Sequence, residues 1–399
     1  MDEAGKNAST KGETKENRGE KNRLKRDALN SFAQRRLESL LAPTGVTFDG
    51  PNPWDIQVLN PSLYHRLLLN GSLSLGQGYM NHSWECEQID ELINRILRSD
   101  IAQRHTFVSH ALSWLSARFF NLQSQRRAFQ VGEQHYDIGN DLYQAMLDQR
   151  MVYSCGYWAD SDTLEAAQQA KLDLICRKLE LQPGMTVLDI GCGWGSFAKY
   201  AAERYGVAVV GVTVSKEQAE WAGRACRHLP MEIRLQDYRQ LDQRFDAVAS
   251  VGMFEHVGHK NYRAFMQVVD RCLKPEGKCL LHTIGKNHSR RGLDPWTAKY
   301  IFPNGEIPSM RQISAGVESL LVVEDWHNFG PDYDKTLMAW FRNFDSAWSQ
   351  LTTHYPESFY RMWKYYLLSC AGAFRARKLQ LWQIVLSKGL SFQAYRRPA

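Results

Sequence analysis

Residues 186–215 read TVLDIGCGWGSFAKYAAERYGVAVVGVTVS, a segment in which three glycines separate a short apolar run from a helical pattern. The β-branched and apolar residues 186–188 predict a strand that ends at Asp189. Gly191, Gly193 and Gly195 then allow a turn tight enough for a ligand to touch the backbone. Apolar residues at helical spacing follow, and VAVVGVTV predicts a second buried strand. The segment therefore predicts a βαβ unit.

Two classes of nucleotide site place a glycine turn before a helix in such a unit. Dinucleotide enzymes use GxGxxG, with an acidic residue for the ribose roughly twenty residues further on. Here the spacing is GxGxG, the second strand ends in Thr213 and Ser215, and the carboxylate, Asp189, precedes the glycines. This pattern resembles the S-adenosylmethionine (SAM) site of class I methyltransferases. A tight connection without a ligand is the alternative, but Asp189, Trp194 and the βαβ unit in register favour the cofactor.

The composition limits the kind of protein. A chain of 399 residues is long enough for two domains, and 44% hydrophobic residues are typical of a globular protein. Aromatic residues, at 12%, fill cores but also line pockets for long apolar ligands. A formal charge of +6 would not repel an anionic surface, and no nucleic-acid motif accompanies it. The eight cysteines form no CxxC pair and no zinc spacing, so they suit a reducing cytoplasm.

The first part of the chain predicts a small domain. Residues 1–27 lack apolar periodicity and predict a disordered tail. Residues 28–41 predict an amphipathic helix whose apolar face includes Leu29 and Phe32. We expect residues 28–120 to form a mostly helical domain, with short strands near Val46 and Ile56, a turn-rich segment from Gly71, and helices over 89–97 and 107–119. Residues 121–127 predict a linker. No apolar run is long enough to cross a bilayer, so any lipid substrate would be approached from one side.

Residues 128–399 predict a larger α/β domain. A helix is expected over 163–179, before the βαβ unit, and EIRLQDY, FDAVASVGMFEH and KCLLHTIG each predict a short buried strand that ends in a polar residue. Ligands of open parallel sheets bind outside the carboxyl ends of the strands. Asp237, Glu255 and His282 are therefore expected at the same edge as the glycines. Aromatic stripes at helical spacing over 337–348 and 359–366 favour a core over an acyl pocket.

Six longer motifs follow one another along this domain: YSCGYW (153–158), LDIGCGWG (188–195), SVGMFEHVG (250–258), LLHTIG (280–285), YIFPNGEIPS (300–309) and HNFGPDYDKTLMAW (327–340). Together with LGQGYMNHSWEC in the small domain, they resemble the bacterial cyclopropane-fatty-acyl-phospholipid synthase family from about Ala28 to the C-terminus. The resemblance implies a class I methyltransferase (Rossmann-like) sheet with a smaller, mostly helical N-terminal domain. It also implies a reaction that adds a methylene from SAM across a cis double bond of a phospholipid acyl chain, with bicarbonate as the bound base.

The resemblance further implies the site residues. Cofactor contacts would fall on Tyr153, Ser154, Gly191, Gly193, Thr213 and Gln218, to which the strand ends add Asp189 and Asp237. The bicarbonate pocket would be formed by Cys155, Glu255, His282, Ile284 and Tyr333. An alkene that attacks a sulfonium methyl creates a carbocation, and ring closure then needs a proton removed. A side-chain carboxylate could trap that cation, so a small external base is a reasonable solution.

Alternatives remain at this point. The chain could catalyse another SAM-dependent acyl-chain modification, such as methyl branching, or it could be a catalytically silent lipid- or SAM-binding protein. The expected partners are unsaturated phospholipid, a homodimer partner as the resemblance suggests, and the inner membrane surface, touched reversibly from the cytoplasm. Weak attraction to lipid head groups is expected from scattered basic residues: Arg35, Arg36, Arg126, Arg127, Arg375, Arg377, Lys378, Arg396 and Arg397.

Overall fold

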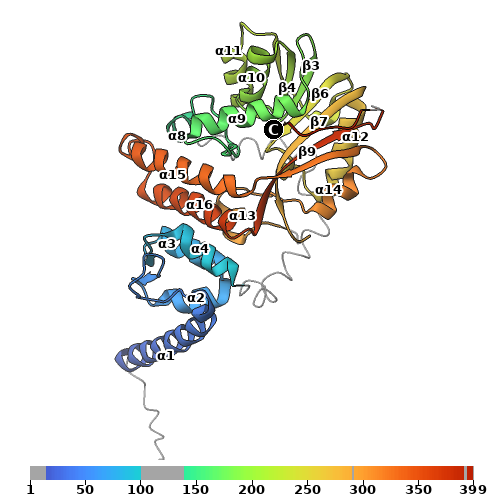
Figure 1. The fold of residues 1–399 in the computed structure, drawn as a ribbon. Helices are drawn as coiled ribbons and strands as arrows, with labels where there is room; N and C mark the ends of the chain where they lie inside the picture. Colours follow the sequence, from blue (N-terminus) through green and yellow to red (C-terminus); the bar gives the residue numbers. More distant parts are fainter. Residues whose placement is uncertain (1–14, 100–138, 290–291, 391–392, 399) are drawn as a thin grey trace, which may run out of the picture.

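The computed structural model describes residues 15–99, 139–289, 292–390 and 393–398. The N-terminal part, which the sequence predicts to be a small domain and which keeps that name below, contains α1 (Lys15–Leu41), η1 (Ala42–Thr44), β1 (Gln57–Val58), α2 (Ser62–Asn70), α3 (Ser72–Met80), β2 (Trp84–Glu85) and α4 (Ile89–Arg98). Figure 1 shows this domain at one end of the molecule, with the start of α1 extending away from it. The predicted helix over 107–119, the linker over 121–127 and the domain boundary at 128 lie outside the described residues.

Two predictions for the small domain are wrong. Helix α1 begins at Lys15 rather than Ala28, so residues 15–27 are helical and do not belong to the predicted disordered tail. These residues are rich in Lys, Arg and Glu, which favour a helix even without an apolar stripe. The segment from Gly71 is not only turns, since it forms α3. Its glycines serve close packing: a Cβ atom at Gly76 would lie 2.4 Å from Trp296, and one at Gly78 would lie 2.8 Å from Leu63. The glycines that suggested turns in the sequence are instead needed where α3 packs closely against Trp296 and Leu63.

The large domain is built on a seven-stranded sheet in the order β5-β4-β3-β6-β7-β9-β8. Strands β3 (Thr186–Ile190), β4 (Ala208–Thr213), β5 (Met231–Leu235), β6 (Phe245–Val251) and β7 (Leu273–Lys286) are parallel. Strand β9 (Leu379–Ser387) pairs antiparallel with β7 and with β8 (Val322–Asn328). The predicted α/β class and the βαβ unit are confirmed, but β5 is a half-exposed edge strand rather than a buried one.

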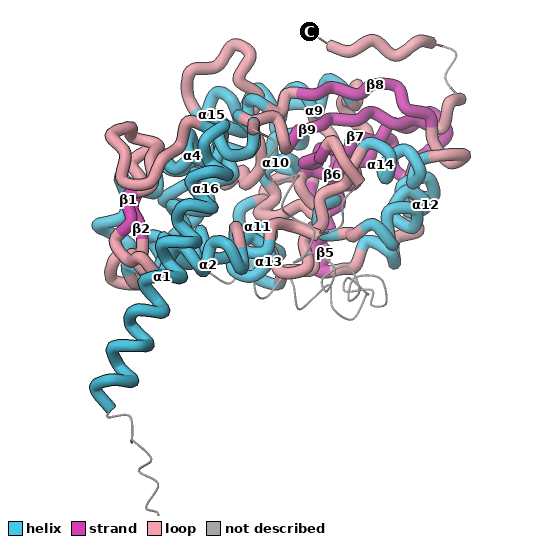
Figure 2. The backbone as a smooth tube through the Cα atoms, turned by 90° about the horizontal axis from the view of Figure 1, so that it is seen from below, coloured by secondary structure: helices cyan, strands magenta, loops and turns pink. Residues whose placement is uncertain are grey.

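Helices cover both faces of this sheet (Figures 1 and 2). On one face, α9 (Leu164–Lys178) and α10 (Ser196–Tyr205) bury apolar side chains against β3, β4 and β6. On the other face, α12 (Tyr262–Cys272) and α14 (Met310–Val317) do the same. The remaining elements are α8 (Asn140–Met146), α11 (Lys216–Ala225), η2 (Tyr238–Gln240), η3 (Phe254–His256), η4 (His259–Asn261), α13 (Pro295–Tyr300), α15 (Pro331–Leu351) and α16 (Glu357–Arg375).

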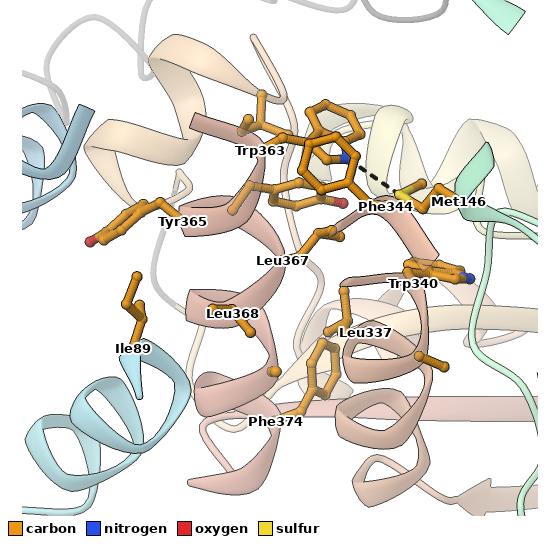
Figure 3. Packing of buried hydrophobic residues seen from close by; sticks show 14 of the residues in the cluster. Ile89, Met146, Leu337, Trp340, Phe344, Trp363, Tyr365, Leu367, Leu368 and Phe374 are labelled. Atoms are coloured by element: carbon orange, nitrogen blue, oxygen red, sulfur yellow. Dashed lines mark hydrogen bonds between the residues drawn. The ribbon is translucent and has the colours of Figure 1, made fainter. Parts of the chain in front are cut away.

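Helices α15 and α16 lie between the sheet and the small domain (Figure 1). The predicted aromatic stripes form part of one buried cluster, in which Trp340, Phe344 and Trp363 are fully buried. Figure 3 shows these rings, with the Trp363 indole N–H donating to Met146 Sδ at 3.2 Å. Arg361 of α16 fastens the small domain, because its Nε donates to Tyr79 O at 2.6 Å. Within the described residues, no helix combines the length and apolar character needed to cross a membrane.

Candidate functional site

The glycine loop after β3 shapes a cavity at the carboxyl edge of the sheet. Gly191, Gly193 and Gly195 have backbone φ values of 81°, 57° and 82°, which residues other than glycine rarely adopt. The Gly191 and Cys192 N–H groups both donate to Val212 O, at 2.9 and 3.0 Å, so the loop is bound to the end of β4. A Cβ atom at Gly193 would meet no protein atom within 4 Å. The loop thus leaves open space above its backbone.

All eight residues predicted for the cofactor line this one cavity, although their sequence positions span 85 residues from first to last: Tyr153, Ser154, Asp189, Gly191, Gly193, Thr213, Gln218 and Asp237. Thr213 Oγ1 donates to Gln218 Oε1 at 3.0 Å, and Asp237 pairs with Arg239 at 2.6 Å. Asp189 Oδ2 is buried and has no hydrogen-bond partner among the described residues. Lys171, Arg239 and His256 also line the cavity and were not predicted.

A second group of predicted residues adjoins the cavity. Cys155, Ile284 and Tyr333 pack together with Phe329 and Leu381. Glu255 joins them from η3, since its Oε1 accepts a hydrogen bond from the Ile284 backbone N–H at 2.6 Å. The structure therefore brings together four of the five residues expected in the anion pocket by contact. The fifth, His282, lies on β7 two residues before Ile284 and so faces the same side of the sheet.

His282 is held from the neighbouring strand. It lies opposite Gln383 in the β7–β9 register, and Gln383 Nε2 is 3.3 Å from His282 Nδ1. If the amide N–H donates, Nδ1 is the acceptor and Nε2 of the neutral ring carries the proton. His282 Nε2 is buried without a partner among the described residues, and so is Glu255 Oε2. One potential donor and one carboxylate oxygen are thus left without protein partners in this part of the site.

The motif at 300–309 fastens Glu255. The Glu306 N–H donates to Glu255 O at 2.8 Å, which joins the segment after α13 to η3. Glu306 Oε2 in turn accepts from the His259 backbone N–H at 3.1 Å and lies 2.6 Å from His259 Nδ1. Glu306 therefore bonds to the backbone of Glu255 in η3 and to His259 in η4, and so joins the two short helices.

Burial controls protonation in the site. It raises the pKa of Glu255 to about 7, against the opposing hydrogen bond from the Ile284 N–H. Burial lowers the pKa of His282 well below its usual value, so the ring is neutral. Burial also raises the pKa of the Cys155 thiol, and it stays protonated. Cys155 is thus no thiolate nucleophile. No group of His, Cys, Asp and Glu in the described part of the chain is arranged to hold a metal ion.

Comparison with known proteins identifies the family of this chain. The chain matches the family described as mycolic acid cyclopropane synthetase over residues 123–384. The chain belongs to this family. A cyclopropane-fatty-acyl-phospholipid synthase of Escherichia coli strain K12 is 54% identical over 358 residues, which cover 89% of this chain and 94% of that protein. The family and the enzyme class predicted from the sequence are confirmed.

Two solved structures of cyclopropane synthases have a fold similar to that of this chain. The cyclopropane synthase MmaA2 from Mycobacterium tuberculosis has a TM-score of 0.62 at 32% identity, covering 67% of this chain and all of that one. The mycolic acid cyclopropane synthase CmaA1, complexed with SAH and CTAB, has a TM-score of 0.61 at 35% identity, covering 65% of this chain and 98% of that one. Both similarities extend over about two thirds of this chain.

Proposed function

We propose that this chain transfers a methylene from SAM across a cis double bond of an unsaturated phospholipid acyl chain, forming a cyclopropane ring, with bicarbonate as the bound base. The observation that carries the proposal is that two sets of residues lie next to each other. The first is the glycine-rich cavity, in which Asp189 Oδ2 has no partner among the described residues. The second is the buried group in which Glu255 Oε2 and His282 Nε2 have none. When bound, SAM supplies the methyl group and bicarbonate supplies the base that removes a proton from it.

The residues present fit both groups. Asp189 Oδ2 offers an acceptor for a cation, as the ammonium of a methionine moiety requires. Glu255 and His282 together offer a carboxyl group and an imidazole N–H, which suit an anion that both accepts and donates hydrogen bonds. Glu255 and His282 would hold bicarbonate, with Tyr333 beside them. The Ile284 N–H and Gln383 orient the two side chains, so these groups need no rearrangement to bind.

The surroundings protect a cationic acyl chain. The Tyr153 and Trp340 rings lie 5.2 Å apart, and Tyr333 lies 5.9 Å from Trp340. Aromatic faces stabilise positive charge, and they exclude water that would trap it. The protonated Cys155 thiol is a poorer nucleophile than a thiolate, so it neither takes the methyl group nor captures the cation.

Incubation with SAM and vesicles of unsaturated phospholipid tests the reaction. The expected product gains one CH2 and shows cyclopropane protons in place of olefinic protons by NMR. Turnover is expected to fall in bicarbonate-free buffer and to recover when bicarbonate is restored. A methyl-branched product that keeps or saturates the double bond would contradict cyclopropanation. Turnover that is indifferent to bicarbonate would contradict only the assignment of the base.

We also propose that the small domain touches the membrane. Five of the ten large apolar side chains that are exposed in the described residues lie in or beside α1 and α2: Leu29, Phe32, Leu59, Leu68 and Leu69. Arg35 and Arg36 of α1 are exposed near them. Two other predicted basic contacts are less available, because Arg375 pairs with Asp90 and Asp334 and Arg397 pairs with Asp325. Arg126 and Arg127 lie outside the described residues.

Sedimentation with anionic vesicles tests this contact. Phe32→Ser and Leu69→Ser, at side chains 60% and 72% exposed, are expected to reduce the bound fraction. Leu235→Ser is the matched control, since Leu235 is 50% exposed on the edge strand β5 of the other domain. Equal binding of all three variants would contradict contact through the small domain. Binding that does not weaken at raised salt would contradict the part assigned to Arg35 and Arg36.

The remaining proposals follow from the family. We propose a homodimer at the cytoplasmic side of the inner membrane, where two small domains would bind one lipid surface more tightly than one. Native mass measurement of the purified chain tests the dimer. A monomer at working concentration would contradict it.

A further inference from the structure

Helix α9 carries two lysines that are fully buried, Lys171 and Lys178, seven residues apart on one face. Lys178 has its own partners, with Nζ 3.0 Å from His327 Nδ1 and 3.7 Å from an oxygen of Asp325. Lys171 instead lines the cofactor cavity, and its Nζ donates to Ser154 Oγ at 2.8 Å. No carboxylate oxygen of the described residues lies within 4 Å of Lys171 Nζ. A buried cation without a direct counter-ion thus stands at the cavity wall.

The bond from Lys171 fixes the direction of the Ser154 hydroxyl. An ammonium group only donates, so Ser154 Oγ must accept from it and has its own proton left to donate. Among the described residues, no acceptor is found for that proton. Gln168, three residues before Lys171, is also fully buried, and its Nε2 donates to Ser154 O at 2.8 Å. Helix α9 therefore holds both the backbone and the side chain of Ser154.

The cavity consequently has two polar features of opposite kind. One is the Ser154 O–H backed by the Lys171 ammonium, which suits an anion. The other is the unpartnered Asp189 Oδ2, which suits a cation. The methionine end of SAM carries a carboxylate and an ammonium on one carbon atom. We infer that Lys171 is a positioning residue for the cofactor: it directs the Ser154 hydroxyl at the SAM carboxylate, while Asp189 receives the SAM ammonium.

The charges around Lys171 give this inference a pH signature. Burial lowers the pKa of Lys171 to about 8, and the nearby carboxylates of Asp148 and Asp189 oppose this change. The Cys155 thiol also lies near the ammonium, but it is protonated and carries no charge. Burial raises the pKa of Asp189 to about 7, and Lys171 opposes that change. Two other groups respond to these charges. Burial and the charge of Asp189 raise the pKa of the Cys192 thiol, and burial and the charge of Lys171 lower the pKa of His282. Without the Lys171 charge, Asp189 would keep its proton to higher pH. The ionised form of Asp189 binds the SAM ammonium more tightly, so SAM affinity should rise with pH as Asp189 loses its proton. In Lys171→Met this rise should occur at higher pH than in the wild type.

The inference rests on the SAM cofactor of the proposed function, and calorimetry with two ligands tests it. The probes are SAM and decarboxylated SAM, which lacks only the carboxylate. The wild type is expected to bind decarboxylated SAM about 10-fold to 100-fold more weakly, because a hydrogen bond to a charged group is lost. Lys171→Met should bind SAM more weakly by a similar factor, should no longer distinguish the two ligands, and should show the shifted pH profile. Ser154→Ala should also lose the distinction, and it keeps the test decisive if Lys171→Met does not fold.

Lys178→Met is the matched control, since it removes an equally buried cation from the same helix while Asp325 keeps Arg397 as its partner. It should prefer SAM as strongly as the wild type does. A Lys171→Met or Ser154→Ala variant that keeps the wild-type preference for SAM would overturn the inference. A wild type that binds no SAM at all would instead overturn the proposed cofactor, and the inference with it.

Discussion

Replacing Glu255 by glutamine should change stability and turnover in opposite directions. Burial raises the pKa of Glu255 from 4.5 to about 7 in the folded protein. Ionising the carboxyl group therefore costs folding free energy. The cost is absent below pH 4.5, grows between pH 4.5 and 7, and is complete above pH 7. A shift of this size corresponds to about 3 kcal/mol. Glutamine avoids the cost because it has no charge, and its amide oxygen can still accept from the Ile284 N–H.

Urea unfolding of the ligand-free protein at pH 5 and pH 8 measures this effect. The wild type should lose up to about 3 kcal/mol of unfolding free energy through this group as the pH rises, and Glu255→Gln should lack that loss. Glu276→Gln, at an exposed position of β7, is the control and should keep the wild-type pH profile.

Turnover of Glu255→Gln should fall by about 100-fold or more, because a preorganised group beside the reacting atoms is replaced. SAM affinity should stay close to the wild-type value, since Glu255 does not line the cofactor cavity. A carboxylate that only fastened η3 would behave differently. A variant that is fully active and less stable than the wild type at pH 8 would refute the reasoning.

Three further substitutions test individual residues. Gly193→Val should abolish SAM binding with the fold retained, because a Cβ atom at this position, where φ is +57°, meets no protein atom within 4 Å and would enter the space assigned to the cofactor; unchanged affinity by calorimetry would contradict this. Cys155→Ser should keep substantial activity, because the thiol is protonated and serves in packing rather than as a nucleophile. A folded variant with no turnover would show that the thiol is needed for the reaction. Gln383→Leu should lower turnover by about fivefold to tenfold with SAM affinity unchanged, since it removes the bond to His282 Nδ1; wild-type turnover would show that this bond does not position the ring.

The parts of the fold that depend on local pattern could be predicted from the sequence. The βαβ unit is specified by residues adjacent in the chain, because the glycine turn, the helical spacing and the apolar strands all lie within 186–215. The convergence of strand ends follows from the parallel arrangement alone. Helix α3 could not be predicted in this way, since the neighbour that requires Gly76 is Trp296, 220 residues away in the sequence. Strands β8 and β9 were also missed; they lie beyond β7 in the sheet, where β9 pairs antiparallel with β7 and β8 pairs antiparallel with β9.

The residues that hold the site are harder to predict than those that line it, because each acts through a partner that only the fold brings near. Gln383 meets His282 across 101 residues through the β7–β9 register, and a strand sequence does not state its register. Lys171 left a weak signal: it shares the buried face of α9 with Leu164 and Ile175, where a solvated lysine would not be placed. A charge inside a predicted apolar stripe therefore indicates a buried partner nearby. Which partner it is, here the Ser154 hydroxyl, depends on how α9 packs against the chain before it.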